Sequence, residues 1–320
     1  MGKNIIAIDL GGTSAKLAIV TPKGDIINQW SVPTDNKNQG RHIVPTLIES
    51  IQDYIKTHNM SLNSIMGIGM GSPGKVNTKE GTVIGAYNLN WKELQDIQTQ
   101  FKSAFNLPFV IANDANVAAL GEQWQGAGNN EPNVVMVTLG TGVGGGIVNE
   151  GHLVYGQEGA AGEIGHLIVD PNLPFLCTCG NRGCLESVAS ATGLMNLVKY
   201  SIQNCPEDSL LKNKSLEKLE SKDVFDAAKA GDQYAEDIIE HYSKYLGLAC
   251  SHIANMLNPK RIVLGGGVSL AGDYLLSKVD RYFRDFCFPP LRDSTDLVLA
   301  ELGADAGVLG AAQLLNLVKE

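Results

Sequence analysis

The chain has 320 residues, of which 44% are apolar and 18% charged, and a formal net charge of −9. This length allows two domains, each with its own core. The acidic balance leaves no broad positive surface for nucleic acid, and no apolar run is long enough to span a membrane. Because the chain begins directly in a strand-like segment without a cleavable signal, we expect a cytoplasmic protein that binds neither nucleic acid nor membranes.

Two stretches of the sequence, residues 5–27 and 134–154, share one layout. Each has a β-branched strand, a Leu-Gly pair, a turn rich in Gly and Thr, a second strand, and a Gly-containing turn into a third. An offset of 129 positions aligns Asp9 with Thr138 and Gly11 with Gly140. This internal similarity predicts two related domains, each opening with a three-stranded meander.

The remaining segments alternate between helix and strand. In the first half of the chain, the patterns predict a helix over 41–58, a strand over 64–74, and a strand followed by a helix over 107–126. In the second half, they predict a long helix over 232–258 with Asp232 as its N-cap. A buried strand that begins at residue 260 and ends in three glycines follows, and then an apolar helix over 304–318. Charged residues between about 206 and 223 predict a solvated surface segment. The isolated Cys205, Cys250 and Cys287 are expected to be partly buried small apolar residues.

The turns DLGGT (9–13) and LGTGVGGG (139–146) present backbone N–H groups without obstructing side chains, as a phosphate site requires. A single turn of this kind would be interpreted as an ordinary hairpin turn. Because two such turns occur at equivalent positions of a duplicated unit, we favour the interpretation that they bind one nucleotide from both sides. Asp9 is suited to a hydrated Mg²⁺ that bridges phosphates. The predicted contacts are Asp9, Gly11, Gly12, Thr13, Gly140, Thr141, Gly142 and Val143.

Asn113 and Asp114 lie where a predicted buried strand gives way to a helix. An Asp at such a junction is commonly an N-cap. It is also where α/β domains place ligand chemistry, and a kinase needs a carboxylate to accept the proton of the attacking hydroxyl. Asp114 is therefore the candidate base, and Asn113 a candidate partner of a sugar hydroxyl.

A cluster of metal-binding residue types follows in the second half of the chain. Glu163 and His166 are three residues apart, which by itself is as typical of a surface ion pair. His166, Cys177, Cys179 and Cys184, however, offer one imidazole and three thiolates, a tetrahedral set for Zn²⁺. In a reducing compartment such a cluster favours a metal over disulfides. Four protein ligands saturate zinc, so the predicted site is structural rather than catalytic.

The two turns resemble those of the actin-like, sugar-kinase and heat-shock ATPase superfamily, which implies that LGGGVS (264–269, with Gly265 and Gly266) and residues 303–312 lie beside the adenosine. The glycines could equally form a tight strand-to-helix turn. GEIGH followed by CTCGNRGCLES, with DLGGT, GSPG, NDAN, LGTGVGGG and LGGGVS, resembles the signature of the ROK family of repressors, open reading frames and sugar kinases. This resemblance spans nearly the whole chain. One departure is Ser14, where many members have Lys; Lys16 follows two positions later.

The resemblance implies an α/β protein with the two-domain actin-like, ribonuclease-H-like ATPase fold and an active-site cleft between the domains. The expected domains are 1–112 with about 303–320, and 113–302 carrying the zinc loop. The resemblance further implies ATP with Mg²⁺, structural Zn²⁺, a homodimer or dimer of dimers, and Asp114 as base. His166 would present one ring nitrogen to zinc and the other to the sugar. The implied sugar contacts are Asn113, Asp114, Glu163, His166 and Glu186.

GCLESVASATG and NLNW (88–91) are similar to the bacterial glucokinases of this family, which adds Asn88 as a sugar contact and predicts phosphorylation of the 6-hydroxyl of glucose. N-acetylglucosamine, N-acetylmannosamine and fructose kinases share most of these residues and remain alternatives. A sugar-sensing repressor is disfavoured because only eight residues precede Asp9, too few for a DNA-binding domain there. The presence of Asp9, both turns and Asp114 in one chain also argues against a silent scaffold.

Overall fold

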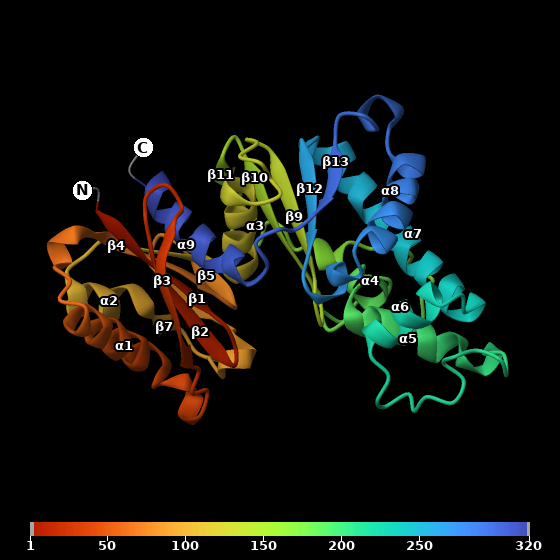
Figure 1. Cartoon of the computed structure of the whole chain (residues 1–320), viewed down its shortest axis with the longest axis horizontal. Helices are drawn as coiled ribbons and strands as arrows, with labels where there is room; N and C mark the ends of the chain where they lie inside the picture. The colour runs from red at the N-terminus through yellow and green to blue at the C-terminus, as the bar shows by residue number, and fades with distance from the viewer. Residues whose placement is uncertain (1–2, 319–320) are drawn as a thin grey trace. The chain divides into compact units, whose positions relative to one another are not determined.

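The computed structural model describes residues 3–318 and contains two five-stranded sheets of the same design. In the first, a meander is extended by two parallel strands in the order β3-β2-β1-β4-β8 (Figure 1). Its strands are β1 (Asn4–Leu10), β2 (Ser14–Val20), β3 (Ile26–Pro33), β4 (Ile65–Ser72) and β8 (Phe109–Asn113). The predicted meander and both later strands are confirmed.

The second sheet repeats this plan in the order β11-β10-β9-β12-β13, with β9, β12 and β13 parallel. Its strands are β9 (Val134–Leu139), β10 (Val143–Asn149), β11 (His152–Leu153), β12 (Arg261–Gly265) and β13 (Asp296–Leu299). A meander followed by two parallel strands thus occurs twice, as the internal similarity predicted. This duplicated α/β design is the expected actin-like fold.

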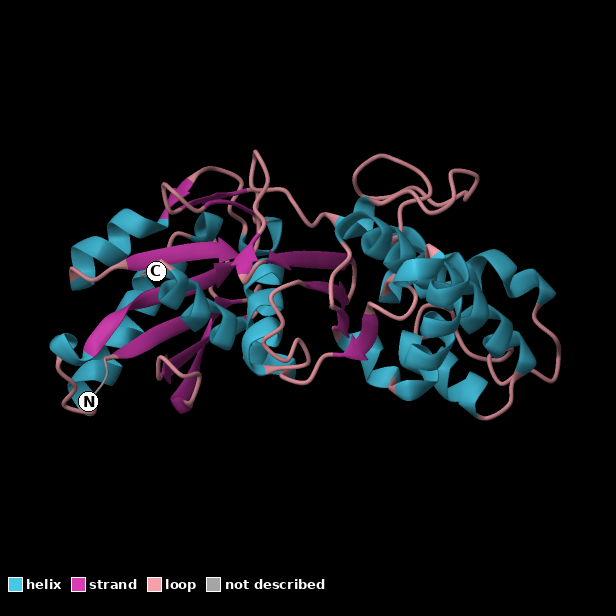
Figure 2. Ribbon diagram, turned by 90° about the horizontal axis from the view of Figure 1, so that it is seen from above, coloured by secondary structure: helices cyan, strands magenta, loops and turns pink. Residues whose placement is uncertain are grey.

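The first sheet is buried on both faces, which explains why residues 5–8 in the middle of β1 form an uninterrupted apolar run. Alternate side chains point to opposite faces: Ile6 and Ile8 join the core under α1 (Ile43–Thr57) and α2 (Ile97–Phe105), whereas Ile5 and Ala7 pack with α9 (Ala306–Leu317). Figure 2 shows the resulting layers of strands flanked by helices. This burial on two sides fixes the carboxyl end of β1, where Asp9 lies.

The chain divides into two compact units, and the division differs from the expected boundaries. The first unit contains the described residues up to Pro132, Gly146–Gly162 and those from Leu302; the second contains Asn133–Gly145 and Glu163–Glu301. Helix α3 (Asp114–Gln125) belongs to the first unit because it packs closely on α9: a β-carbon at Gly121 or Gly310 would collide with the backbone of the other helix. Gly146 likewise lies against α3.

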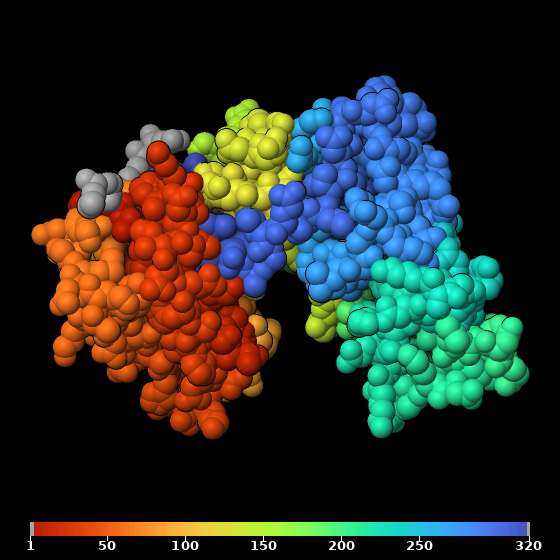
Figure 3. Space-filling model, in the orientation of Figure 1, coloured from red at the N-terminus to blue at the C-terminus, as the bar shows by residue number. Residues whose placement is uncertain are grey.

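The helices of the second unit surround β9, β12 and β13. They are α4 (Glu186–Ala189), α5 (Ala191–Ser201), α6 (Ser221–Lys229), α7 (Gln233–Leu257) and α8 (Asp273–Phe286). The α7 N-cap is Asp232, as predicted, whose side chain accepts the N–H of Ala235 at 3.1 Å. Residues 206–220 run over the surface of this unit with little regular structure (Figure 3). None of the helices described between residues 3 and 318 is both long and apolar enough to cross a membrane.

Two smaller features complete the fold. A three-stranded sheet in the first unit consists of β5 (Lys75–Asn77), β6 (Thr82–Ile84) and β7 (Gln95–Asp96). Cys205, Cys250 and Cys287 are buried, as predicted for small apolar residues.

Candidate active site

The first glycine-rich turn closes the β1–β2 hairpin. The N–H of Gly11 donates to the carbonyl of Ser14 at 3.0 Å, and the Thr34 hydroxyl donates to the carbonyl of Gly11 at 2.8 Å. Gly12 faces the exposed side chain of Asn88, which would lie 3.3 Å from a β-carbon added at this position. Asn88 comes from the short helix Tyr87–Leu89. The structure therefore brings two predicted contacts, this turn and Asn88, together within the first unit.

Asp9 lies at the end of β1 with its carboxylate against the first turn of α9, so closely that a β-carbon at Gly307 would collide with it. Burial, and to a smaller extent the charge of Asp114, raise the pKa of Asp9 to about 6, while Lys16 acts in the opposite direction. A cation at this carboxylate would favour its charged form, so the residue fits the Mg²⁺ role expected of it. Gly307 is a neighbour that sequence reasoning did not identify.

Lys16 does not extend freely from the hairpin. Its ammonium donates to the carbonyl of Ala304 at 2.7 Å and to the carboxylate of Asp305 at 3.2 Å. These contacts hold the segment that leads into α9, within residues 303–312. Lys16, which follows Ser14 by two positions, thus binds the segment that leads into α9.

Asn113 and Asp114 have different roles at the start of α3. Asn113 is the N-cap: its Oδ1 accepts the N–H of Ala115 at 3.0 Å, and its Nδ2 donates to the carbonyl of Gly74 at 3.2 Å. Asp114, the first residue of the helix, is therefore not the cap. Its carboxylate accepts the N–H of Ala115 at 2.9 Å.

Burial raises the pKa of Asp114 above its ordinary value, and the hydrogen bond from Ala115 opposes this shift only in part. A desolvated carboxylate is a stronger proton acceptor than one in water, which suits a general base. The electrostatic influence of Asp114 on Asp9 also links these two carboxylates within the first unit. Together they give this unit two acidic groups near one turn.

The second glycine-rich turn joins β9 to β10. The N–H of Gly140 donates to the carbonyl of Gly142 at 3.0 Å, and the N–H of Ala191 donates to the carbonyl of Gly140 at 2.8 Å. Gly266, with φ +85°, packs so closely on Leu139 that any β-carbon would lie 2.6 Å from its carbonyl oxygen. The LGGG segment, including Gly265, is thereby held beside the predicted phosphate turn.

A pocket of about 460 Å³ borders Thr141 of this turn. This volume lies within the range of small-molecule sites. Its other lining residues come from α5 and the segment before α6, which sequence reasoning did not assign to a site: Ala191, Thr192, Met195, Lys199, Leu216, Glu217, Leu219, Glu220 and Ser221. They share no local motif, so only their position in the fold identifies them.

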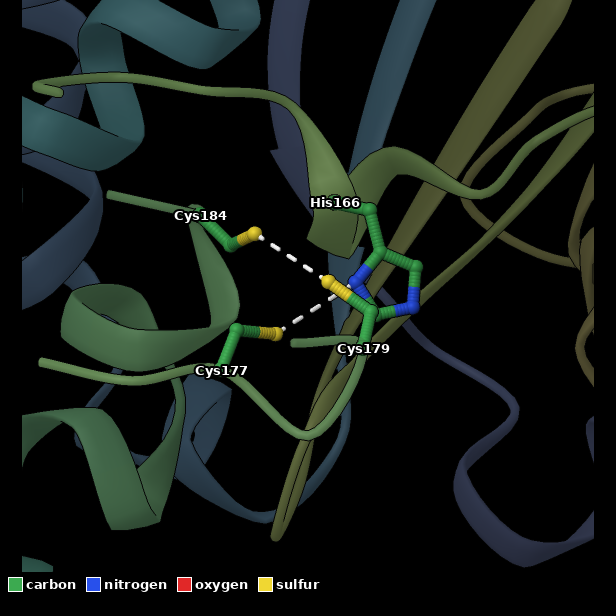
Figure 4. A group of neighbouring side chains, drawn as sticks. All are labelled: His166, Cys177, Cys179 and Cys184. Carbon is green, nitrogen blue, oxygen red and sulfur yellow. Dashed lines mark hydrogen bonds between the residues drawn. The ribbon is translucent and has the colours of Figure 1, made fainter. Parts of the chain in front are cut away.

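The four predicted metal ligands form one cluster in the second unit. The donor atoms of His166, Cys177, Cys179 and Cys184 all lie within 4.8 Å of one another. Figure 4 shows Nδ1 of His166 beside the sulfur of Cys177, at 3.6 Å, and the sulfurs of Cys179 and Cys184 3.6 Å apart. One nitrogen and three sulfurs at this spacing fit Zn²⁺, which would link the two ends of the loop.

The other ring nitrogen of His166 faces away from the sulfurs. Its Nε2 is 3.9 Å from the carboxylate of Glu163, whose side chain is 67% exposed. A metal on Nδ1 leaves Nε2 protonated and able only to donate. The contact of Nε2 with a sugar hydroxyl stays a prediction.

Glu186, the first residue of α4, connects the metal loop with the second turn. Its Oε2 accepts the N–H of Val143 at 3.1 Å, and its Oε1 accepts the hydroxyl of Thr178 at 3.1 Å. A β-carbon at Gly142 would collide with the same carboxylate. The sequence did not predict these contacts, because nothing in the spacing of Thr178 between two cysteines indicates a partner.

A duplicated α/β fold with a glycine-rich turn in each half and a half-buried carboxylate at a helix start is typical of the class of proteins with the actin-like ATPase fold. Within that class the chain belongs to the ROK family, whose model matches residues 5–317. The family resemblance expected from the motifs is confirmed.

Individual relatives include both enzymes and regulators. The chain is 40% identical over 312 residues to a glucokinase of Halalkalibacterium halodurans, covering 97% of this chain and 94% of the relative. It is similar to the crystal structure of a ROK family glucokinase from Streptomyces griseus in complex with glucose and AMPPNP, with 32% identity, a TM-score of 0.75, and 97% and 98% of the two chains covered. A ROK family transcriptional regulator, a homologue of the E. coli MLC protein, has a TM-score of 0.86 at 28% identity, covering 99% of this chain and 78% of the regulator. One fold thus serves two functions, so the site has to decide between them.

Proposed function

We propose that this chain is an ATP-dependent glucokinase, which transfers the γ-phosphoryl group of ATP to the 6-hydroxyl of glucose. The observation that carries the proposal is the half-buried carboxylate of Asp114, whose pKa desolvation raises and which does not cap α3, because Asn113 is the N-cap. The 40% identity to a glucokinase along nearly the whole chain supports it. A regulator would not require this carboxylate, and the regulator named above is less similar in sequence, at 28% identity.

In this proposal Asp114 accepts the proton of the 6-hydroxyl as that oxygen bonds to the γ-phosphorus and ADP leaves. Asn113 is assigned to a sugar hydroxyl beside Asp114: its oxygen caps α3, and its amide N–H groups are directed to the carbonyl of Gly74 and to the carboxylate of Asp114. His166 donates from Nε2, while the carboxylates of Glu163 and Glu186 accept from sugar hydroxyls. Asn88 is a further sugar contact.

The nucleotide is assigned to the two turns, with N–H groups on the phosphates and Asp9 as the residue that would hold Mg²⁺. Bound Mg²⁺ would supply positive charge to the phosphate oxygens. We assign the adenosine to the pocket that borders Thr141, since Gly265 and Gly266 also lie in this part of the second unit. Zn²⁺ held by His166, Cys177, Cys179 and Cys184 would give the loop a fixed shape.

The test is ADP release measured over a panel of glucose, fructose, mannose, N-acetylglucosamine and N-acetylmannosamine. Glucose is expected to give the highest kcat/KM, with N-acetylhexosamines lower by about tenfold or more because of their larger C2 substituent. A higher kcat/KM for an N-acetylhexosamine or fructose would reassign the substrate, and no ADP release with any sugar would overturn the kinase. Light scattering on the same sample tests the homodimer or dimer of dimers that the family resemblance implies.

A further inference from the structure

Glu186 is expected to bind sugar, yet in the structure both oxygens of its carboxylate already have protein donors. One donor is the N–H of Val143 in the second glycine-rich turn, and the other is the hydroxyl of Thr178 in the metal loop. A hydrogen bond from a backbone N–H to a carboxylate is charge-assisted and stronger than a neutral one. The carboxylate of Glu186 therefore holds the turn in the structure.

The second glycine-rich turn has backbone N–H groups that are available to bind a phosphate. In the described part of the chain, residues 3–318, no hydrogen-bond partner is seen for the N–H groups of Thr141 and Gly142. Glu186 binds the next N–H along, that of Val143, and lies so near Gly142 that a β-carbon added there would be 2.3 Å from its Oε2. Fixing Val143 limits the conformations of the turn, so less conformational entropy is lost when a phosphate binds its neighbours.

Thr178 is the residue that orients this carboxylate. The sulfur of Cys177 is also near Oε1, at 3.8 Å, but a thiol is a weak donor and a metal-bound thiolate has no proton to donate. The Thr178 hydroxyl at 3.1 Å is therefore the stronger support on that side. Its position between Cys177 and Cys179 means that the metal loop determines where it lies.

We propose that Thr178 is a positioning residue for the nucleotide: through Glu186 it holds the turn 139–143 in the shape that binds phosphate. The proposal rests on the kinase function proposed above and extends it, because it makes the metal loop a determinant of ATP affinity and not only of sugar affinity. The loop, the carboxylate and the turn all lie in the second unit.

The experiment compares Thr178→Val, which removes the hydroxyl but keeps the branched shape, with Thr178→Ser, which keeps the hydroxyl. Binding of Mg²⁺·AMPPNP is measured by calorimetry without sugar. We expect Thr178→Val to weaken binding about fivefold, as for a lost hydrogen bond to a partly exposed charged group, and Thr178→Ser to stay within about twofold of wild type. Asn181→Ala, in the same loop but without a side-chain contact to Glu186 in the described structure, serves as a further control.

Zinc content per chain and Tm are measured on all variants, and both are expected to be unchanged. Equal AMPPNP affinity for wild type and Thr178→Val, or tighter binding by the variant, would overturn the proposal. Equal weakening in Thr178→Ser and Asn181→Ala would also overturn it, because the effect would then come from general disturbance of the loop. If wild type bound no AMPPNP, both this proposal and the kinase would be wrong, whereas nucleotide binding without ADP release from any hexose would overturn the sugar kinase alone.

Discussion

The two glycine-rich turns share one sequence layout but have different partners. The turn at Gly11 and Gly12 faces the neutral amide of Asn88, and the turn at Gly142 faces the carboxylate of Glu186, which binds the N–H of the next residue. The backbone hydrogen bonds of the turns differ as well: the N–H of Gly11 donates to the carbonyl of Ser14, whereas the N–H of Gly140 donates to that of Gly142. The Thr34 hydroxyl holds the first turn at the carbonyl of Gly11, and Glu186 holds the second turn and connects it with the metal loop.

The carboxylates of the two units also differ in their surroundings. Asp9, Asp114 and Glu186 are all partly exposed, but loss of hydration raises the pKa of Asp9 and of Asp114. The carboxylate of Glu186 differs from them in accepting two hydrogen bonds at 3.1 Å, one at each oxygen. A desolvated carboxylate is suited to taking up a proton or a cation, and one with two donors is suited to holding structure in place. In the function proposed here, the first unit would supply the acid–base chemistry and the second the positioning.

Asp114→Asn tests the chemical role of the first unit and should have the largest effect. We expect kcat to fall by roughly a thousandfold, because the amide cannot accept the hydroxyl proton, while glucose binding measured by calorimetry stays within a few fold. Asp273→Asn is the matched control, since Asp273 is likewise the first residue of a helix, α8. Unchanged kcat in Asp114→Asn would remove this residue as the base.

Cys179→Ser tests whether the metal loop positions the sugar-binding residues of the second unit. With one thiolate lost, we expect zinc content by elemental analysis to fall well below one per chain and KM for glucose to rise on the order of tenfold. Cys205→Ser, which changes a buried cysteine outside the cluster, should retain zinc. Loss of zinc with an unchanged KM for glucose would show that the loop and the sugar site are independent.

Alanine at each turn compares the two partners directly. Neither Gly12 nor Gly142 has a positive φ, so the available space decides the outcome. Gly142→Ala would displace the Glu186 carboxylate from Val143 and should raise KM for ATP about tenfold, whereas Gly12→Ala meets the movable side chain of Asn88 at 3.3 Å and should raise it less than about threefold. Steady-state kinetics at saturating glucose measures both. Equal effects would mean that the turns do not differ in rigidity.

The pH dependence of stability tests the desolvation of Asp9. Its pKa rises from 3.8 in the unfolded chain to about 6 in the folded one, so the folded state retains a proton between these values that the unfolded state has released. The contribution of Asp9 to stability therefore falls as pH rises from about 4 to 6. The Asp9→Asn variant has no carboxylate to desolvate. Its free energy of unfolding should therefore exceed that of wild type above pH 6, by up to about 3 kcal/mol, and differ little from it near pH 4.

The measurement is Tm of both proteins at pH 4.5 and pH 7.5 without nucleotide or Mg²⁺. The gain in Tm of Asp9→Asn should be present at pH 7.5 and largely absent at pH 4.5. The same gain at both values would show that the effect comes from packing against Gly307 rather than from charge.

Much of the fold could be predicted because its signals are local. Helical periodicity identified α1 and α7, and the capping role of Asp232 was visible from its place before an apolar helix. The division into units could not be predicted in the same way. Residues 113–132 and 146–162 belong with the first unit because glycines let α3 approach α9 and the second meander, and such contacts join positions nearly 200 residues apart.

The sequence by itself determined the duplicated turns, the family and the four residues of the metal cluster, since each depends on residue types at short spacing. Tertiary structure alone decided that Asn113 rather than Asp114 caps α3, and that Glu186 holds the N–H of Val143. The physical reason is that a motif specifies which groups are available, whereas packing selects which of several equally suitable donors and acceptors meet. The roles of neighbouring carboxylates therefore follow from burial and hydrogen-bond partners, which the spacing of residues does not contain.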